Sequence, residues 1–361
     1  MRRWLKVIVF VLILFLLIYL GLVVESIIAK PKILPLTYVK RGGTAVVITG
    51  AAARIVQEAA LLEHLDKTGW LANVCFISGT SSGALNTVML NAVLENKISW
   101  EQYNSLLFGL NNDDIYIKAG KSLPVNNEPY HDLLTRIVND SLGYKKIGDL
   151  PFNSSMSISD VDLFPPFSKT YRLSNIKINA ESNPEFNLVD VLMASTAIPV
   201  IFPPIRFKES FGLPNSAFMD GGLGEDHIPY TAVLQFEKFR NYGVDTLIIV
   251  SRKSDINPEL KNELLNLGNN DSRISGRLSY RIENLARNSF IKSMRVLQQK
   301  YPELAKRTYV FIPDFPEDFA LLNFSNLRKQ YMVCANWAES HKPVPLNQFL
   351  AESAQEEKTH K

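Results

Sequence analysis

Short apolar runs alternate with amphipathic stretches along most of the chain after residue 43. Residues 44–49 (TAVVIT) and 73–77 (NVCFI) are short, apolar and rich in β-branched side chains, which is typical of strands buried inside a sheet. Residues 54–65 and 84–95 carry apolar side chains at helical spacing. We predict further strands at 156–158, 170–173, 217–219, 246–250 and 308–312. This order favours an α/β fold with a mainly parallel sheet flanked by helices.

The most hydrophobic stretch lies at the amino terminus. Val7 to Val24 (VIVFVLILFLLIYLGLVV) carries no charge and follows a basic segment, residues 1–6. At 1.5 Å per residue it spans about 27 Å as a helix, close to the roughly 30 Å of a bilayer core. We therefore predict one transmembrane helix at 7–24, followed by a linker at 25–43. A cleaved signal peptide is the alternative, but it usually has a shorter apolar region and a small-x-small cleavage site, which Val23–Ile27 lacks.

The flanking charges bear on the orientation of this predicted helix. Basic residues before it favour an amino terminus inside the cytoplasm, which places the body of the protein outside, although Lys30 and Lys32 lie on the far flank. Residues 111–144 are polar and interrupted by Gly120 and Pro124, and we interpret them as a lid-like insertion.

Composition excludes several classes of function. The chain has 361 residues, 46% of them hydrophobic and 21% charged, as in an ordinary globular protein. Its net charge of +3 is supplied by Arg2, Arg3 and Lys6 alone, so the body lacks the basic surplus of a nucleic-acid-binding protein. Two cysteines cannot form a disulfide framework or a thiolate metal site, and the five histidines include no H-E-x-x-H pair. We predict no metal, no cofactor and no nucleic-acid partner.

A serine in a glycine-flanked turn is the candidate nucleophile. Gly79-Thr80-Ser81-Ser82-Gly83 fits the G-x-S-x-G pattern of a nucleophile elbow and selects Ser81. The predicted strand before it and the predicted helix after it are the context that this motif requires. Such a serine has a strained backbone, and Gly79 and Gly83 let neighbouring chain approach closely. The positive end of the helix favours negative charge that develops at the serine.

A nucleophilic serine needs a proton acceptor, and Asp220 is the candidate. Asp220-Gly221-Gly222 follows the apolar residues 217–219, which places a carboxylate at the end of a predicted strand. Taken alone, Asp-Gly-Gly is most often a turn.

Four motifs occur in the order found in one enzyme family. They are Gly50-Ala51-Ala52-Ala53-Arg54, then Gly79–Gly83, then Ala194-Ser195-Thr196-Ala197-Ile198-Pro199 with Phe202-Pro203-Pro204, and finally Asp220-Gly221-Gly222. With these motifs, the chain from about residue 44 to the early 230s resembles the patatin-like phospholipases. The resemblance implies a three-layer patatin-like fold over residues 44–345, followed by a polar tail at 346–361. It also implies a lipid ester substrate and a Ser-Asp dyad, with Ser81 as nucleophile and Asp220 as general base.

The resemblance further implies an oxyanion hole built from backbone amides of Gly50, Ala51, Ala52, Ala53 and Arg54. The family's loop is usually glycine-rich, and here alanines replace two of its glycines and Ile55 a third. Alanine keeps its N–H, but a required positive φ would strain Ala51 or Ala52. Arg54 matches the family's basic residue; the alternative is a solvated arginine in the first turn of a helix.

Two other functions stay open at this point. One is a non-catalytic lipid-binding scaffold that kept the fold after losing its oxyanion hole. The other is a Ser-His-Asp esterase with His227 as the base, although His227 follows Asp220 closely in the chain. Outside the motifs, a basic helical face within residues 273–307 could contact anionic head groups, or it could simply be solvated. The sequence thus predicts a membrane-anchored lipid acyl hydrolase of unknown oligomeric state.

Overall fold

The computed structural model describes residues 40–117, 124–161, 169–209, 211–253, 289–317, 319 and 323–359. The predicted anchor at 7–24 and residues 273–288 of the basic segment lie outside these residues. Among the helices that are described, none is long and apolar enough to cross a membrane.

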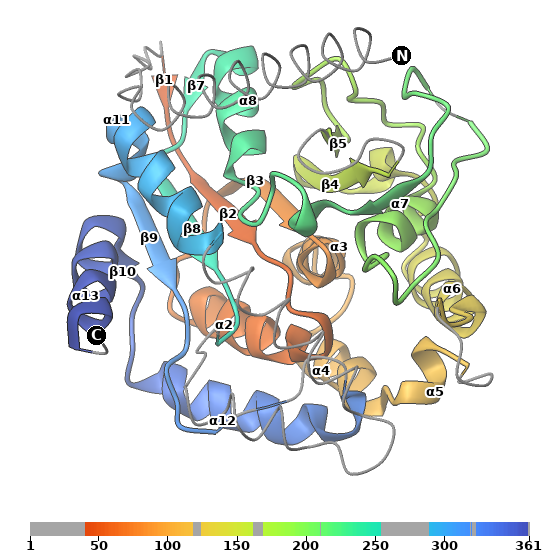
Figure 1. Ribbon diagram of the computed structural model, residues 1–361, viewed down its shortest axis with the longest axis horizontal. Helices are drawn as coiled ribbons and strands as arrows, with labels where there is room; N and C mark the ends of the chain where they lie inside the picture. The colour runs from red at the N-terminus through yellow and green to blue at the C-terminus, as the bar shows by residue number, and fades with distance from the viewer. Residues whose placement is uncertain are drawn as a thin grey trace, which may run out of the picture.

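An eight-stranded sheet runs through the middle of the described structure (Figure 1). Its strand order is β10-β9-β8-β2-β3-β4-β5, with β6 paired to β4. The pairs β9-β8, β8-β2, β2-β3 and β3-β4 are parallel, and the pairs of β10, β5 and β6 are antiparallel. The strands are β2 (Thr44–Ile48), β3 (Val74–Thr80), β4 (Ser154–Asp160), β5 (Thr170–Ser174), β6 (Phe218–Asp220), β8 (Thr246–Val250), β9 (Thr308–Phe311) and β10 (Val344–Pro345); a separate pair joins β1 (Lys40–Arg41) to β7 (Tyr242–Gly243).

Both faces of the sheet are covered, because successive residues of each central strand point into different cores. In β2, Ala45 and Val47 belong to one apolar cluster, while Val46 and Ile48 belong to another on the opposite face. All four side chains are fully buried. This two-sided burial explains why the sequence of β2 is apolar throughout rather than alternating.

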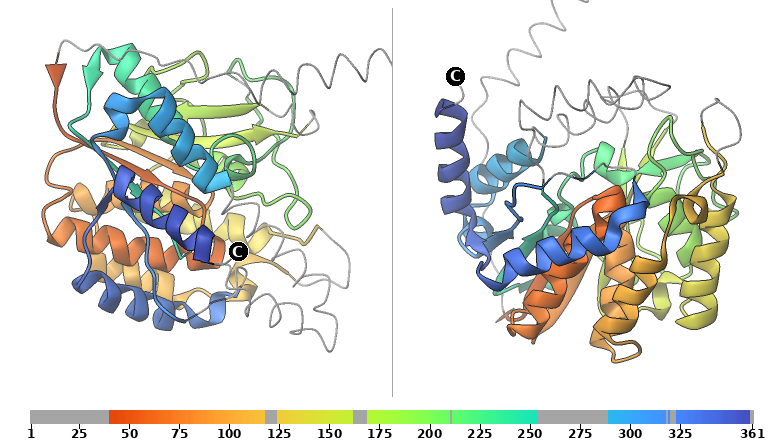
Figure 2. Two further views of the ribbon diagram at one scale, coloured as in Figure 1. Left: turned by 60° about the vertical axis from the view of Figure 1, so that its left-hand side comes forward. Right: turned by 90° about the horizontal axis from the view of Figure 1, so that it is seen from below.

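The helices form the two outer layers (Figures 1 and 2). On one face lie α2 (Ile55–Lys67), α3 (Ser82–Leu94), α4 (Trp100–Gly109) and α12 (Leu327–Glu339). On the other lie α8 (Tyr230–Arg240), a helical segment at 289–300, α11 (Pro302–Ala305) and α13 (Leu346–Thr359). At the β4–β5 end of the sheet lie α5 (Asn112–Ile115), α6 (Glu128–Leu134), the π-helical η2 (Thr135–Ser141) and α7 (Leu188–Ser195). Short 3-10 turns are η1 (Ala52–Arg54), η3 (Ile147–Asp149), η4 (Gly221–Leu223) and η5 (Phe324–Asn326). The predicted three-layer α/β fold with a mainly parallel sheet is confirmed for the described residues.

Two predicted segments differ from the structure. The lid-like insertion at 111–144 is wrong for its described residues, because Ile115, Tyr130, Leu134 and Val138 are buried in the core cluster at the β4–β5 end. The segment at 346–361, predicted as a polar tail, contains α13, which buries Leu346 and Leu350 against the sheet. In both segments a few apolar side chains at helical spacing sit among many polar ones, and that is enough to dock a helix.

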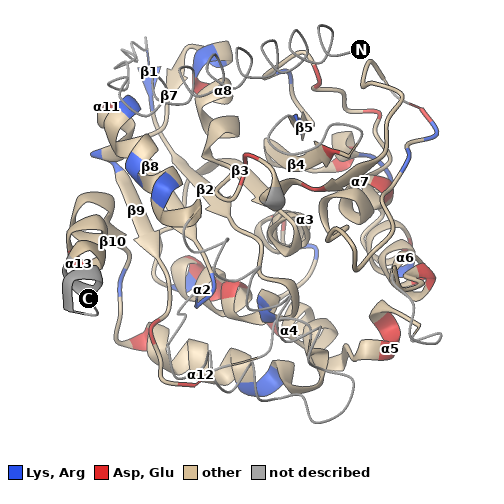
Figure 3. Cartoon of the chain, viewed as in Figure 1, with Lys and Arg blue, Asp and Glu red and all other residues tan. Residues whose placement is uncertain are grey.

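Acidic and basic side chains are concentrated in different helices of the described structure. Acidic side chains colour α5, whereas basic ones colour the helical segment at 289–300 (Figure 3). These two regions lie in different parts of the fold. The near-neutral total charge therefore includes a local excess of acidic residues and a local excess of basic ones.

Candidate active site

The ends of β3 and β6 meet head to head beside β4. Thr80, the last residue of β3, pairs with Ser157, and Asp220, the last residue of β6, pairs with the next residue, Ile158. Since β5 occupies the other edge of β4 at Ile158, β6 continues the line of β3 but runs in the opposite direction. Neighbouring positions along a strand are about 3.3 Å apart. The sheet therefore brings the residue after β3, Ser81, next to Asp220.

Ser81 lies in a strained turn between β3 and α3. Its backbone has φ 55° and ψ −133°, a region that side-chain-bearing residues rarely adopt. The flanking glycines are required by close approach: a Cβ on Gly79 would lie 2.2 Å from the Gly83 carbonyl oxygen, and one on Gly83 would lie 2.3 Å from the Thr49 carbonyl oxygen. Gly50 is equally confined, since its Cβ would lie 2.8 Å from Ser81 Cβ. This geometry is that of a nucleophile elbow.

Asp220 is buried, with 3% of its surface exposed, and the Ser81 hydroxyl lies close enough to its carboxylate to favour the ionised form. Its Oδ1 accepts the Gly222 N–H at 2.8 Å. Burial raises the pKa of Asp220 to about 6, and the contacts with Ser81 and Gly222 oppose that rise. A carboxylate with this pKa is a much better proton acceptor near neutrality than an ordinary aspartate. The predicted pair of Ser81 and Asp220 is thus brought together.

Gly221 and Gly222 allow the turn after Asp220 to pass beside β4 and β3. A Cβ on Gly221 would lie 2.5 Å from the Ser157 carbonyl oxygen. A Cβ on Gly222 would lie 3.1 Å from the Asp220 Oδ1 that its own N–H binds. The first glycine is needed for close packing, and the second keeps the carboxylate in place.

The loop predicted to form the oxyanion hole lies against the elbow, but its amides have different partners. The Ala51 N–H donates to Ser82 Oγ at 2.7 Å, and the Arg54 N–H donates to the Ala51 carbonyl at 2.9 Å. Ala52 has φ 46°, so the strain expected of an alanine in this loop falls on Ala52 and not on Ala51, whose φ is −134°. Of the alanine and arginine amides in the loop, those of Ala52 and Ala53 remain the candidates to face an oxyanion.

Arg54 is buried, so its interpretation as a solvated arginine is wrong. Its Nε donates to the Phe319 carbonyl at 2.8 Å, and its Nη1 donates to the Lys253 carbonyl at 3.2 Å. The Lys253 ammonium in turn binds the carbonyls of Phe315 and Glu317. Arg54 therefore ties the loop before α2 to segments far along the chain.

Sequence reasoning missed a buried polar network behind this loop. Glu58 on α2 accepts hydrogen bonds from Thr49 Oγ1 at 3.0 Å and from Asn86 Nδ2 at 3.1 Å, and Thr49 also bonds the Ser251 hydroxyl at 2.7 Å. Burial raises the pKa of Glu58 to about 8, although Thr49, Arg252 and Asn86 favour its charged form. The only signal in the sequence was that Thr49, Glu58 and Asn86 each lie in or beside an otherwise apolar strand or helix. The pattern of polar and apolar positions does not distinguish such buried polar residues from exposed ones.

Ser195 is a second residue whose role the sequence did not reveal. It lies at the end of α7, inside the Ala-Ser-x-Ala-x-Pro motif, and is completely buried. Its hydroxyl donates to the Ser157 carbonyl at 2.8 Å and accepts the Ser81 N–H at 3.0 Å. The motif serine thus contacts the elbow itself.

His227, the alternative base, is half-buried, and burial lowers its pKa while Asp226 opposes that change. Asp226 is fully buried and accepts hydrogen bonds from Ser157 Oγ at 2.6 Å and from Arg172 Nη2 at 2.7 Å. The carboxylate beside His227 in the chain, Asp226, is therefore held by Arg172 and Ser157.

Within the part of the chain that is described, no group of three or more His, Cys, Asp or Glu side chains is placed to hold a metal ion.

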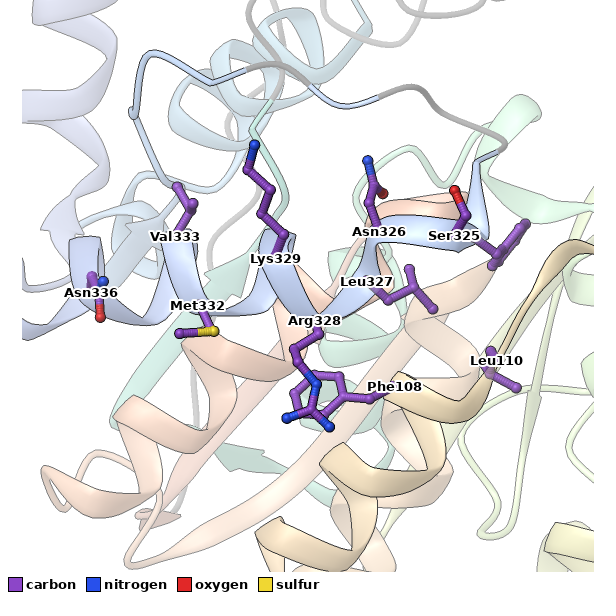
Figure 4. Close-up of a pocket in the computed structure, with 11 residues that line it drawn as sticks. Phe108, Leu110, Ser325, Asn326, Leu327, Arg328, Lys329, Met332, Val333 and Asn336 are labelled. Atoms are coloured by element: carbon purple, nitrogen blue, oxygen red, sulfur yellow. The ribbon is translucent and has the colours of Figure 1, made fainter.

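A surface hollow of about 620 Å³ lies along α12, apart from these residues (Figure 4). Its walls include Phe108, Met332 and Val333, and the Arg328 guanidinium stacks over the Phe108 ring at 4.7 Å. In Figure 4, Lys329 and Asn326 point away from Phe108. Neither Ser81 nor Asp220 lines this hollow.

The motifs agree with a match to one protein family. The family model described as patatin-like phospholipase matches residues 46–234, more than half of the chain. No curated protein matches. Among solved structures, VipD from Legionella pneumophila is 13% identical, with a TM-score of 0.43, over 85% of this chain and 67% of VipD. The type III effector protein ExoU is 12% identical, with a TM-score of 0.37, over 86% of this chain and 53% of ExoU. From the family match, the chain belongs to the patatin-like phospholipase family and is a lipid acyl hydrolase.

Proposed function

We propose that the protein hydrolyses ester bonds of phospholipids or related lipids through a Ser-Asp dyad, with Ser81 as nucleophile and Asp220 as general base. The observation that carries this proposal is the meeting of β3 and β6 on β4, which puts the Ser81 hydroxyl beside the buried Asp220 carboxylate, in a turn where Ser81 has a positive φ. Strained residues of this kind persist where the surrounding structure holds them for function.

In the first half-reaction, Ser81 Oγ attacks the ester carbonyl carbon while Asp220 takes the hydroxyl proton. The tetrahedral intermediate then collapses, the bond to the leaving alcohol breaks, and the proton on Asp220 passes to that alcohol. In the second half, Asp220 takes a proton from water as the water oxygen attacks the acyl-enzyme. The fatty acid leaves, and Ser81 recovers its proton.

The developing oxyanion needs donors in place before the reaction. We propose the amides of Ala52 and Ala53, because the Ala51 N–H is occupied by Ser82 Oγ and the Arg54 N–H by the Ala51 carbonyl. The positive end of α3, which begins directly after Ser81, adds to this field. Losing one such donor typically costs on the order of 10²–10³ in rate.

The test uses full-length protein on a panel of lipid esters in detergent micelles, together with a fluorophosphonate probe. Ser81→Ala should lose both hydrolysis and labelling. Asp220→Asn should lose hydrolysis and label at least about 100-fold more slowly. His227→Ala should keep nearly full activity, because in a Ser81-Asp220 dyad the carboxylate of Asp220 is itself the base and no histidine takes part.

Hydrolysis by folded Ser81→Ala protein would contradict the dyad. Loss of activity in His227→Ala alone would favour the Ser-His-Asp esterase. If the folded wild-type protein neither labels nor hydrolyses any ester, the non-catalytic scaffold is the better description.

We further propose that residues 7–24 anchor the enzyme in a membrane, with its catalytic domain outside the cytoplasm. The support is the uncharged run from Val7 to Val24 and the three basic residues before it. Full-length protein should remain with membranes after carbonate washing, whereas protein lacking residues 1–39 should not. Protease added to intact cells or spheroplasts should digest the catalytic domain. Protection from protease with retained membrane binding would reverse the orientation.

A further inference from the structure

The end of α7 and the residues just after it contact both halves of the proposed dyad. The Ser81 N–H donates to Ser195 Oγ at 3.0 Å, and two residues later the Ala197 carbonyl accepts the Asp220 N–H at 3.0 Å. Consecutive Cα atoms are 3.80 Å apart, so residues 195 and 197 can lie at most about 7.6 Å apart. One short, buried piece of chain is therefore hydrogen-bonded to the backbones of nucleophile and base.

The hydrogen-bond polarity at Ser195 is fixed. A hydroxyl has one proton, and Ser195 donates it to the Ser157 carbonyl at 2.8 Å. A lone pair of Ser195 Oγ then faces the Ser81 N–H. Ser157 is the residue of β4 that pairs with Thr80, so Ser195 bridges β4 to the elbow where β3 ends. Ser195 has no exposed surface, and water cannot replace either bond without a rearrangement.

The strand arrangement explains why such a bridge is needed. Because β3 and β6 meet end to end, neither is hydrogen-bonded to the other as adjacent strands would be, and β4 is the strand to which both are paired; on its other side β3 pairs with β2, and Phe218 of β6 bridges to Ile205. The relative position of Ser81 and Asp220 thus depends on contacts made after the strands end. Ser195 and Ala197 provide one such contact to each residue.

We propose that Ser195 is a positioning residue for the reaction: its hydroxyl holds the Ser81 backbone in its positive-φ conformation and, with the Ala197 carbonyl, sets the distance between Ser81 Oγ and the Asp220 carboxylate. This inference rests on the proposed dyad. It assigns the serine of the Ala-Ser-x-Ala-x-Pro motif a role in geometry, with no contact to the substrate.

The test compares Ser195→Ala with a matched control, Ser174→Ala. Ser174 is also fully buried, its hydroxyl also donates to a carbonyl of β4 (Ser154, 2.7 Å), and it also accepts a backbone N–H (Ile176, 3.4 Å). It lies on β5 and contacts neither Ser81 nor Asp220 through these bonds. Both variants should lose stability, since each removes a buried hydroxyl from two backbone partners.

Only Ser195→Ala should change catalysis per active site. Turnover, normalised to fluorophosphonate-titrated sites, should fall roughly 10- to 100-fold with little change in KM, because misplacement by about 1 Å costs rates of this order. The midpoint of its pH–rate profile should also move upward, since burial raises the pKa of Asp220 and the contact with Ser81 is one of the two that oppose the rise. Ser174→Ala should keep the wild-type turnover per site and the wild-type midpoint.

Two further variants keep the test decisive if Ser195→Ala does not fold. Ser195→Thr retains the hydroxyl and should turn over faster per site than Ser195→Cys, whose thiol is a weak donor and acceptor. Equal behaviour of Ser195→Ala and Ser174→Ala, or of Ser195→Thr and Ser195→Cys, would overturn the proposal. Ser81→Ala run in parallel separates the two hypotheses: if it retains activity, the dyad itself is wrong, whatever Ser195 does.

Discussion

Ala52 shows how a single methyl group bears on the candidate site. Its φ of 46° lies in the left-handed region, where a Cβ costs on the order of 1–2 kcal/mol and glycine costs nothing. Ala51 beside it has φ −134° and needs no glycine. Two of the family's loop glycines became alanine here, and only one of those changes places a side chain in a strained conformation.

We expect Ala52→Gly to leave stability unchanged or to raise it by up to about 1 kcal/mol, because relief of strain offsets the added entropy of the unfolded chain. Ala51→Gly should instead cost about 0.5–1 kcal/mol, since it gains only that entropy. Urea denaturation of both variants measures the difference. Equal destabilisation of the two would show that Ala52 is not strained.

The carboxyl of Asp220 links activity to pH and to stability. Burial raises its pKa from 3.8 to about 6, so kcat/KM of the wild-type enzyme should rise with pH, with a midpoint near 6, as the base becomes ionised. In the unfolded chain this carboxyl ionises at a lower pH than in the folded protein, because its pKa there is the ordinary value of 3.8. Folding stability is therefore lost as pH rises from about 3.8 to about 6 and is level above that.

The corresponding measurement is urea denaturation of the wild type and of Asp220→Asn across pH 4.5–7.5. The variant has no such proton, so its stability relative to the wild type should grow by on the order of 2 kcal/mol across this pH range and level off above about 6. A difference that stays constant with pH would mean that Asp220 has an ordinary pKa in the fold.

At the scale of elements, apolar runs in the sequence predicted the strands of the sheet well. They did not predict contacts between polar side chains. The strand at 246–250 was predicted with the bounds of β8, because a run such as TLIIV has few other uses in a globular protein. Helix α3 begins at Ser82, two residues before the predicted start at 84, because the elbow leads directly into a helix whose first turn contains Ser82 and Gly83. The spacing of apolar residues does not reveal that the helix begins at Ser82, since neither Ser82 nor Gly83 is large and apolar.

In the candidate site, too, some features could be predicted from the sequence and others could not. The motifs placed Ser81 and Asp220 together, since their spacing along the chain carries the family's pattern. The partner of the Ala51 amide, the buried state of Arg54 and the hydrogen bonds of Ser195 depend on side chains from distant segments. Such tertiary contacts leave no periodic trace, and they decide which amides are available to an oxyanion.

At the scale of the whole molecule, the family match ends at residue 234, but the structure that supports the site does not. Strand β8 pairs with β2 just before the loop at residues 50–54, and α12 packs on α2 just after it. Gln57 on α2 binds Gln330 on α12 at 3.2 Å and the Lys253 amide at 3.0 Å. The last third of the chain is therefore part of the catalytic domain.

The hydrogen bonds from Arg54 to the Lys253 and Phe319 carbonyls can form only after those residues have been synthesised. A ribosome completes Ser81 and Asp220 well before it reaches residue 319, so a growing chain carries both reactive groups while the loop beside them still lacks its anchors. We expect such an unfinished chain to be unable to cut lipid. The enzyme would then become active only once its own carboxyl-terminal third has folded over Arg54.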